Sequence, residues 1–463
     1  MSSRPGHLAA LGTELHPARG GAWAGLFLRR RLYALWGLGI AVTATGMLWA
    51  PLMAIGLLVL ASAVLAAAYE YARLSRAGGQ LLAGRRVDER LSLGDDNPVA
   101  VEVRNGSDTR LEVTLLDELP LQLQERDFGE DFHVEPGAER RVTYRVRPRE
   151  RGVYEFGELL LFCGSPLGLV QRRFAFGPPT TRTGVYPSII QMRRQALRVG
   201  QLIRREGAEQ RQRQYGRSYE FDQIKAYVPG DDYRLLNWKA TARTGDLMLN
   251  TYVEERSQQV VALLDTSRTM LAPFSGLALL DHAINSTLAL LNVALLRGDR
   301  VGLYGFDRRI HTRVPPAARP EHLRRILETL YAQQPTDFEP DYAAMYQYVR
   351  REVRGRSLLM LYTNFDTLVS LERQLPVLRQ LSRAHLLVVV MFVNVRVRED
   401  VEAEPATLED AYLNTVAAEY EADQQRIAAT LTNHGILVLR TRPEELTANA
   451  VTRYLEVKRG GRL

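Results

Sequence analysis

A carboxylate and two hydroxyls follow a very apolar stretch near the middle of the chain. Residues 260–264 read Val-Val-Ala-Leu-Leu, and Asp265, Ser267 and Thr269 come after them at alternate positions. One carboxylate and two hydroxyls are hard oxygen donors, the ligand type that Mg²⁺ and Mn²⁺ prefer. The same residue types also cap helices, because their side chains accept hydrogen bonds from free backbone amides. The stretch alone fits a metal site and a helix cap equally well.

The elements that position these residues follow from the pattern around them. A short, continuous apolar run with β-branched residues is typical of a strand buried on both faces. Strands are expected at 260–265, 300–306, 309–314, 357–362, 386–393 and 436–439, and helices at 277–296, 321–333, 342–353, 368–381, 408–432 and 444–458. This alternation predicts an α/β fold with a doubly wound parallel sheet over residues 259–463. Residues just past the strand ends of such a sheet line its ligand crevice.

Composition limits the other kinds of chemistry. A chain of 463 residues has room for two or three domains, and its single cysteine, Cys163, excludes an intramolecular disulfide. The eight histidines are scattered without metal-ligand spacing, so zinc chemistry is not expected. Phosphate-loop and nucleophile-elbow motifs are also missing from the sequence. The formal charge of +7 suits a protein that works against an anionic membrane or touches nucleic acid.

The N-terminal region predicts a membrane anchor. Residues 1–28 carry Gly, Pro, Ser and Arg without periodicity, and we expect a disordered cytoplasmic tail. Residues 29–80 predict a transmembrane helical hairpin, because the uncharged stretch from Leu32 to Tyr69 is long enough for two spans of roughly 20 residues with a break at Pro51. Arginines flank both ends and the turn has none, which places both termini and the bulk of the chain in the cytoplasm. The expected location is therefore the inner, or cytoplasmic, membrane.

Residues 83–190 change to short alternating segments with turn residues between them. A strand at 99–103 ends at Asn105-Gly106, a strong turn signal, and further strands are expected at 111–116, 141–146, 153–162 and 168–176. Short strands at this spacing, without a helical stretch, predict a β-sandwich domain with the architecture of an immunoglobulin-like fold. The paired cysteines of that fold are missing, so only the architecture is predicted.

An arginine-rich segment follows at residues 191–215. It contains Arg193, Arg194, Arg198, Arg204, Arg205, Arg211 and Arg213. Nucleic-acid binding is one interpretation, but no aromatic residues are interleaved for base stacking. A solvated linker, or a patch resting on anionic lipid, is favoured beside a membrane anchor. No nucleic-acid partner is therefore expected.

Residues 216–258 hold the densest motif of the chain. Its polar and aromatic members are Glu220, Pro229, Gly230, Asp231, Asp232, Arg234, Trp238, Lys239 and Arg243. The Pro-Gly-Asp-Asp segment predicts a turn, since proline presets φ, glycine accepts positive φ and the aspartates bond nearby amides. The arginines could brace this turn by pairing with the carboxylates.

These residues resemble the signature of the bacterial family known as domain of unknown function fifty-eight. The shared pattern is Glu220-Phe221, Pro229 to Arg234, Trp238-Lys239 and Ala242-Arg243, and the order of regions also agrees. The resemblance implies a von Willebrand factor A-like domain at residues 259–463. It also implies a metal-ion-dependent adhesion site for Mg²⁺ or Mn²⁺, with ligands at Asp265, Ser267, Thr269, Thr336 and Asn364. Asparagine stands at 364 where aspartate is usual, which lowers the negative charge available to a cation.

The resemblance further implies a scaffold rather than an enzyme. Similar proteins act with a MoxR-type AAA+ ATPase in assembling or activating other complexes, so a membrane-anchored cytoplasmic adaptor is the expected function. A metal-dependent hydrolase using Asp265, Asp337 and Asp366 is an alternative, although no histidine ligand or nucleophile–base pair supports it. Nucleic-acid binding through the arginine-rich segment is the other alternative.

Overall fold

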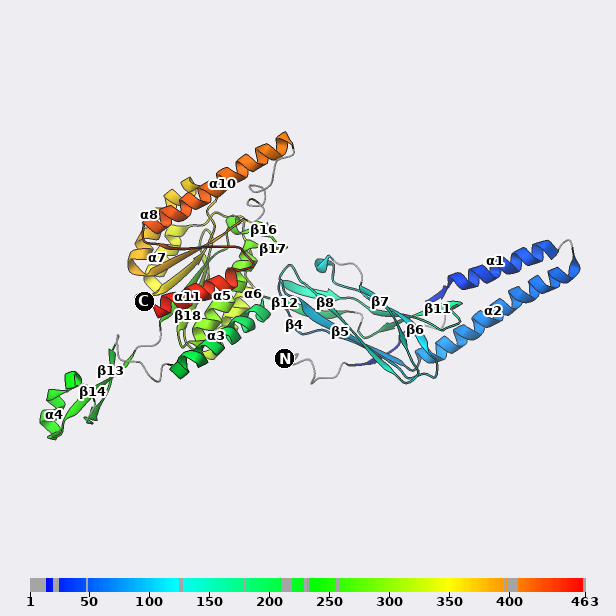
Figure 1. The fold of residues 1–463 in the computed structure, drawn as a ribbon, viewed down its shortest axis with the longest axis horizontal. Helices are drawn as coiled ribbons and strands as arrows, with labels where there is room; N and C mark the ends of the chain where they lie inside the picture. The colour runs from blue at the N-terminus through cyan, green and yellow to red at the C-terminus, as the bar shows by residue number, and fades with distance from the viewer. Residues whose placement is uncertain are drawn as a thin grey trace. The chain divides into compact units, whose positions relative to one another are not determined.

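The computed structural model describes residues 14–19, 25–46, 49–124, 128–178, 180–209, 219–228, 231, 233–254, 258–394, 397 and 407–460. The side chains of residues 50, 202–209, 219–225, 234 and 250–254 lie outside the described set. The chain divides into two compact units, Met1–Tyr186 and Pro187–Leu463 (Figure 1).

A mixed sheet forms the centre of the second unit. Within the described residues its order is β19-β18-β15-β20-β21-β22, and all neighbours are parallel except β18 and β19. The strands are β15 (Gln259–Asp265), β18 (Arg300–Phe306), β19 (Ile310–Ala317), β20 (Leu358–Tyr362), β21 (Leu386–Phe392) and β22 (Leu437–Thr441). The six strands expected from the sequence are present, but the expectation of a wholly parallel sheet is wrong for β19, which returns directly from β18 and runs antiparallel to it. β15 lies between β18 and β20 inside the sheet.

Helices cover both faces of this sheet (Figure 1). One core contains Val260, Ala262 and Leu264 of β15, and the opposite core contains Val261 and Leu263, as the alternation of strand side chains requires. The first face packs on α3 (Ile189–Glu209), α5 (Leu279–Leu296), α6 (Pro320–Tyr331) and α11 (Leu446–Arg459). The second face packs on α7 (Tyr342–Glu352), α8 (Leu368–Ala384) and α10 (Leu408–Asn433).

The expectation of a linker at residues 191–215 is wrong for its described part. Ile189–Glu209 is α3, which contacts α5, and Val199 of α3 is buried in the first core. The apolar residues Met192 and Val199 pack on this core while Arg193, Arg194 and Arg198 are exposed, so a strongly charged sequence still forms an amphipathic helix. The high proportion of arginine made the helical spacing of these apolar residues hard to recognise in the sequence. Residues 210–218 lie outside the described residues.

The motif region folds into a hairpin with an inserted helix. β13 (Tyr219–Ala226) pairs antiparallel with β14 (Met248–Glu254), and α4 (Trp238–Thr244) lies between them in sequence. Asn237 caps α4 by accepting a hydrogen bond from the Ala240 amide at 3.0 Å. A short β16–β17 hairpin (Pro273–Phe274 with Leu277–Ala278) comes just before α5.

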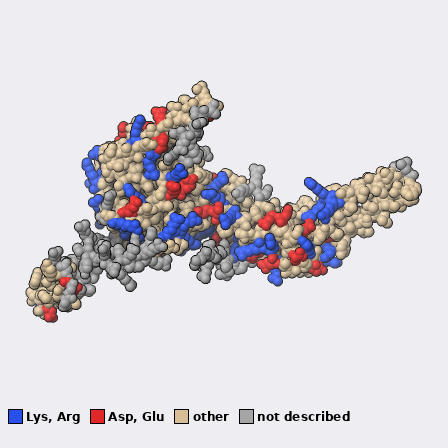
Figure 2. All heavy atoms as spheres, in the orientation of Figure 1, with Lys and Arg blue, Asp and Glu red and all other residues tan. Residues whose placement is uncertain are grey.

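The first unit contains the expected helical pair. α1 (Arg30–Thr45) packs against α2 (Ala50–Gly78). By length and composition, two described helices could cross a membrane, Pro51–Gly78 and Leu279–Leu296. The second is α5, whose apolar window is 78% buried in the sheet core, whereas the window of α2 is only 11% buried. Figure 2 shows the outer part of the α1–α2 pair without charged side chains.

The rest of the first unit is β-structure. Its sheets have the orders β1-β3-β5-β8, β2-β11-β10-β6-β7 and β4-β12-β9 in the described residues. The main strands are β3 (Leu81–Arg86), β4 (Arg90–Ser92), β5 (Asn97–Asn105), β6 (Leu111–Asp117), β7 (Phe128–Val134), β8 (Glu139–Val146), β9 (Gly152–Phe156), β10 (Leu159–Gly164), β11 (Val170–Phe176) and β12 (Thr181–Tyr186). The strand expected over 153–162 is two strands, since the chain turns between Phe156 and Leu159.

The expectation of a disordered tail over residues 1–28 is wrong for its described parts. β1 (His16–Pro17) pairs with β3, and β2 (Leu26–Leu28) pairs with β11. Each of these short strands pairs with the edge of a sheet. The free backbone groups of that edge provide hydrogen bonds for the segment although its sequence shows little periodicity. Residues 1–13 and 20–24 lie outside the described residues.

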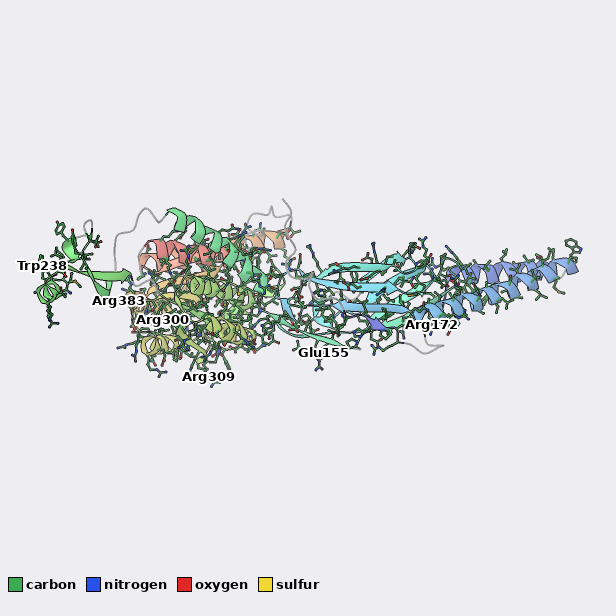
Figure 3. All side chains as sticks on the ribbon, turned by 90° about the horizontal axis from the view of Figure 1, so that it is seen from below. Glu155, Arg172, Trp238, Arg300, Arg309 and Arg383 are labelled. Carbon is green, nitrogen blue, oxygen red and sulfur yellow. The ribbon has the colours of Figure 1, made fainter. Side chains whose placement is uncertain are left out.

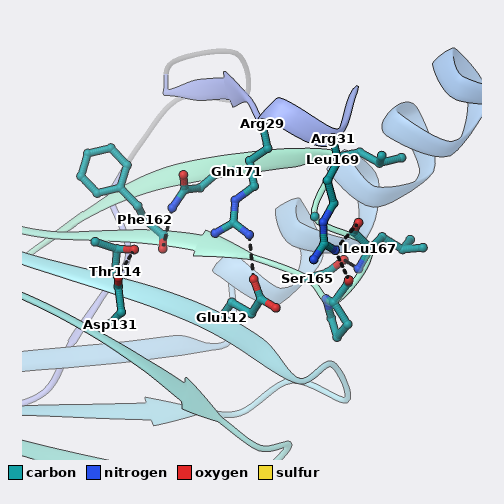
Figure 4. Close-up of polar contacts among 12 residues, drawn as sticks. Arg29, Arg31, Glu112, Thr114, Asp131, Phe162, Ser165, Leu167, Leu169 and Gln171 are labelled. Carbon is teal, nitrogen blue, oxygen red and sulfur yellow. Dashed lines mark hydrogen bonds and ion pairs between the residues drawn. The ribbon is translucent and has the colours of Figure 1, made fainter. Parts of the chain in front are cut away.

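α2 is joined to the β-structure through a buried carboxylate. Glu70 is fully buried and accepts hydrogen bonds from the Ser165 hydroxyl at 2.6 Å and from the amides of Gly168, Leu169 and Val170 at 2.9–3.1 Å. Beside it, Arg29 pairs with Glu112 at 2.7 Å, and Arg31 donates to the carbonyls of Pro166 and Leu167 (Figure 4). The end of the helical pair is therefore bonded to the loop between β10 and β11.

A second buried network lies inside the β-structure. The Asp117 carboxylate, at the end of β6, pairs with Arg85 of β3 and accepts a hydrogen bond from Tyr144 of β8. The Arg85 side chain is 5% exposed and Asp117 is fully buried. Arg85 also donates to the Gly157 carbonyl at 3.0 Å and to the Thr181 hydroxyl at 3.1 Å. One ion pair thus joins strands of different sheets.

Candidate functional site

The loop after β15 brings the three predicted oxygen donors together. Asp265 is fully buried, and its Oδ1 accepts the Ser267 amide at 2.9 Å. Its Oδ2 accepts the Thr269 hydroxyl at 3.4 Å, and the Ser267 and Thr269 hydroxyl oxygens lie 3.0 Å apart. Carboxylate and hydroxyls form one compact group at the carboxyl end of an interior strand.

The helix-cap interpretation of these residues fails. Ser267 precedes a single 3₁₀ turn, Arg268–Met270, and its side chain makes no capping hydrogen bond. The next α-helix begins only at Leu279, after Ala278. The hydroxyls therefore face the carboxylate and one another rather than free helix amides.

Thr336 lies against the same loop, but its hydroxyl is directed elsewhere. Its amide and hydroxyl both donate to the Thr266 carbonyl, at 2.8 and 3.2 Å. The Thr266 hydroxyl donates to the Phe306 carbonyl at 3.1 Å and lies 2.9 Å from Nε2 of His311. Thr336 lines a different cavity, of about 620 Å³, with Asp307 and His311. Thr336 therefore stabilises the backbone of the Asp265 loop, and its hydroxyl is not directed to the Asp265 carboxylate.

Asn364 adds an unsatisfied oxygen near the group. It follows β20 and is 8% exposed, and in the described part of the chain its buried amide oxygen has no hydrogen-bond partner. Asn364 lines a cavity of about 400 Å³ together with Thr269, Asp366 and Tyr420. A buried carbonyl oxygen without a donor is costly unless a cation or water satisfies it. This oxygen is therefore available as a metal ligand.

Two residues of the site were not predicted. The Thr363 hydroxyl donates to Oδ2 of Asp265 at 2.7 Å and lies 2.6 Å from the Tyr342 hydroxyl. Because the Thr363 proton points to Asp265, Tyr342 donates to Thr363. Thr363 precedes Asn364 in the predicted loop, and its hydroxyl could have identified it in the sequence as a residue of the site. Nothing in the sequence marked Tyr342, the first residue of α7, as a neighbour of Asp265.

The electrostatics of the site depend on one buried carboxyl. Burial raises the pKa of Asp265 above its ordinary value, although hydrogen bonds from Ser267 and Thr363 oppose the shift. Burial and the nearby Asp265 charge likewise raise the pKa of Tyr342 well above its ordinary value. Among the described residues no group of three or more His, Cys, Asp or Glu could hold a metal. A cation here would rely on one carboxylate plus hydroxyl and amide oxygens.

The raised pKa of Asp265 predicts how stability responds to pH. With chelator present, the folded state holds the proton more tightly than the unfolded state, so the Asp265 contribution is present at low pH and is lost as pH rises through the folded pKa. We expect amide hydrogen exchange in β15, followed by mass spectrometry between roughly pH 4 and 8, to accelerate with pH by more than the increase in the intrinsic exchange rate accounts for. Asp265→Asn should flatten this difference. Parallel pH profiles for the two proteins would contradict the prediction.

The signature residues are only partly described. Pro229, Gly230 and Asp232 lie outside the described residues, as do the side chains of Glu220 and Arg234. The Asp231 carboxylate accepts the Val228 amide at 3.2 Å, as expected for the turn.

Trp238, at the start of α4 (Figure 3), is 70% exposed. Lys239 and Arg243 are also exposed. Trp238 is thus a surface residue of the hairpin rather than a packing anchor.

A family model matches part of the second unit, in agreement with the resemblance. The model of the family described as Protein of unknown function DUF58 matches residues 223–424. Uncharacterized protein Rv1480 of Mycobacterium tuberculosis and Uncharacterized protein Mb1516 of Mycobacterium bovis are each 23% identical over 266 residues, 54% of this chain and 82% of theirs. Conserved hypothetical protein BatB from Bacteroides thetaiotaomicron aligns with a TM-score of 0.31 and 16% identity, over 44% of this chain and 100% of that one.

Proposed function

We propose that this protein is a membrane-anchored cytoplasmic adaptor whose second unit, a von Willebrand A-like doubly wound domain, binds a protein partner through a cation. One observation carries the proposal. In the loop that holds Asp265, Ser267 and Thr269, the Asp265 carboxylate accepts the Thr363 hydroxyl, and Thr269 lines one cavity with Asn364, at the carboxyl ends of adjacent parallel strands. This edge of an open α/β sheet is where ligands bind. The group contains no nucleophile–base pair, which favours binding over catalysis.

The donor set fits a hard cation such as Mg²⁺ or Mn²⁺. Asp265, Ser267 and Thr269 would hold it, and Asn364 offers the oxygen that lacks a donor. A bound cation would supply positive charge for a carboxylate of the partner. Thr363 and Tyr342 orient Asp265 by their hydrogen bonds, so the carboxylate is positioned before any ligand arrives. Asparagine at 364 leaves the site with less negative charge, which predicts a modest affinity for the cation.

The α1–α2 pair is proposed to span the cytoplasmic membrane with both termini inside. Arg29, Arg30 and Arg31 precede the apolar stretch, and Arg73 and Arg76 lie near its other end. The proposed partner is a MoxR-type AAA+ ATPase, which rests on the family resemblance. The adaptor would then hold this ATPase near the bilayer while other complexes are assembled or activated.

Capture of the partner tests the function. Full-length protein in detergent should retain the MoxR-type ATPase in Mg²⁺, and chelation should release it. Asp265→Ala combined with Ser267→Ala should reduce capture at least about tenfold, since it removes the carboxylate and a hydroxyl ligand. The matched control, Glu372→Ala with Ser382→Ala on α8, should bind like the original protein. Undiminished capture by the Asp265/Ser267 variant would refute the proposal.

A further inference from the structure

The first turns of α10 carry an apolar stripe exposed to solvent. Leu408, Tyr412 and Val416 are spaced by four residues, and Leu413 lies beside them. Their exposed fractions are 89% for Leu408, 70% for Tyr412, 52% for Leu413 and 46% for Val416. Residues four apart lie on one face of a helix, so the side chains form one strip, called here the α10 stripe. Contiguous exposed apolar surface of this kind marks interaction sites.

The stripe does not serve the core of its own unit. Among the described residues of α10, the buried side chains are Ala417, Gln424, Ile427 and Leu431, all beyond the stripe. Figure 1 shows the N-terminal turns of α10 extending past the helices that cover the sheet. A capping box between Thr407 and Asp410 nevertheless fixes the start of the helix. An ordered, projecting helix end with an apolar face is suited to docking.

The charges around the stripe indicate what it docks. Residues 408–425 contain no lysine or arginine, and their acidic residues are Glu409, Asp410, Glu419, Glu421 and Asp423. Glu409 and Glu419 are exposed, whereas Glu421 pairs with Arg440 at 2.9 Å. An acidic rim repels anionic lipid, and helices that lie on membranes carry basic polar faces instead. The complementary partner surface is apolar with a rim of lysine or arginine.

The stripe is continuous with the candidate metal site. Tyr420 is the next residue in the series of four, and it lines the cavity of about 400 Å³ with Thr269 and Asn364. The rise from Leu408 to Tyr420 is about 18 Å, the length of roughly three helical turns. A helix laid along the stripe would therefore reach the cavity with its end.

We propose that the α10 stripe is the docking surface for an amphipathic helical segment of a protein partner, with an apolar face and a basic rim. The helix packs along Leu408, Tyr412 and Val416, and its end enters the cavity beside Tyr420. That the docked partner is the one bound at the cation rests on the function proposed above. Packing of the apolar faces itself does not require the cation.

Binding of defined peptides tests the stripe. The probes are two labelled helical peptides of roughly 18 residues, about five turns, which share a leucine stripe flanked by lysine in one and by glutamate in the other. Full-length protein in phosphatidylcholine nanodiscs should bind the lysine peptide, and bind the glutamate peptide at least about tenfold more weakly. Leu408→Ser with Tyr412→Ser and Val416→Ser should lower affinity for the lysine peptide about tenfold or more. Val369→Ser, at a 62% exposed position of α8, is the matched control and should have no effect.

Two further variants separate the possible causes. Glu409→Lys with Glu419→Lys should reverse the peptide preference without removing the apolar stripe. Asp265→Ala should leave lysine-peptide binding intact while abolishing cation-dependent capture, so the stripe and the cation site can fail independently. Equal binding by the stripe variant and the original protein would overturn the proposal.

Two other occupants of the stripe would overturn it as well. Cys163, the only cysteine, is buried, so a dye on Tyr412→Cys reports from the stripe alone. Quenching of that dye by brominated lipid would show that the stripe lies on the membrane. A dimer of the original protein that becomes monomeric in the stripe variant would show that a second copy covers it. Unquenched dye and an unchanged oligomeric state are expected.

Discussion

Glu70→Ala is expected to remove most of the stability of the first unit. The substitution leaves the buried amides of Leu169 and Val170 without this acceptor, whereas the Gly168 amide keeps the Ser165 carbonyl at 3.0 Å. Each unsatisfied buried donor costs about 1–3 kcal/mol, so the loss of this acceptor by two amides costs about 2–6 kcal/mol. Domains are usually stable by about 5–15 kcal/mol, which makes this loss comparable with the whole. Amide hydrogen exchange in β10 and β11 of the full-length protein should rise by several orders of magnitude.

Two controls isolate the buried carboxylate from charge in general. Glu70→Gln keeps one acceptor oxygen and should cost less than alanine. Glu112→Ala removes a carboxylate of the same region, but the side chains of Arg29 and Glu112 are 28% and 31% exposed. Partly exposed pairs contribute about 0–1 kcal/mol, so this variant should exchange nearly like the original protein. Equal effects of Glu70→Ala and Glu112→Ala would contradict the assignment.

Asp117→Ala should destabilise the β-structure by about 3–5 kcal/mol. It leaves the Arg85 guanidinium, whose side chain is 5% exposed, without a counter-ion in the core. Removing one partner of a buried ion pair costs this much because the remaining charge is not solvated. The measurement is denaturant unfolding of the full-length protein, followed through exchange of β3 and β8.

Tyr144→Phe is the control for Asp117→Ala. It removes one hydrogen bond to Asp117 but leaves the ion pair, so it should cost only about 1 kcal/mol. If the phenylalanine variant loses as much stability as Asp117→Ala, the hydrogen bond rather than the ion pair dominates, and the prediction is wrong.

The sequence was most informative where one periodicity dominated. The strands and helices after residue 259 follow from apolar runs and amphipathic spacing, and each matches an element of the structure. The grouping of Asp265, Ser267 and Thr269 was also predictable, because one loop after one strand holds all three. α3 was missed because the prediction rested on its arginines rather than on Met192 and Val199, the apolar residues between them that pack on the core. Tyr342 was missed because its approach to Asp265 depends on how α7 packs, which local pattern does not encode.

The same contrast holds in the first unit. The apolar helical pair is visible as a long uncharged stretch, whereas its attachment to the β-structure is not. Glu70 reads as one charged residue at the end of an apolar helix, and Ser165 and Gly168 lie far from it in sequence. Only the folded chain shows that this glutamate is buried among backbone amides. Similarly, the β1 and β2 pairings need sheet edges that form from residues much later in the chain.

The joint at Glu70 has a mechanical consequence for an anchored protein. The roughly 20 residues of α2 from Pro51 to Tyr69 rise about 30 Å, close to the thickness of a bilayer's hydrocarbon core. On the proposed topology, Glu70 then sets a fixed stand-off between the lipid headgroups and the loop at Ser165. A tilt of the helices would rotate the β-structure with them, since four hydrogen bonds hold Glu70 of α2 to that loop.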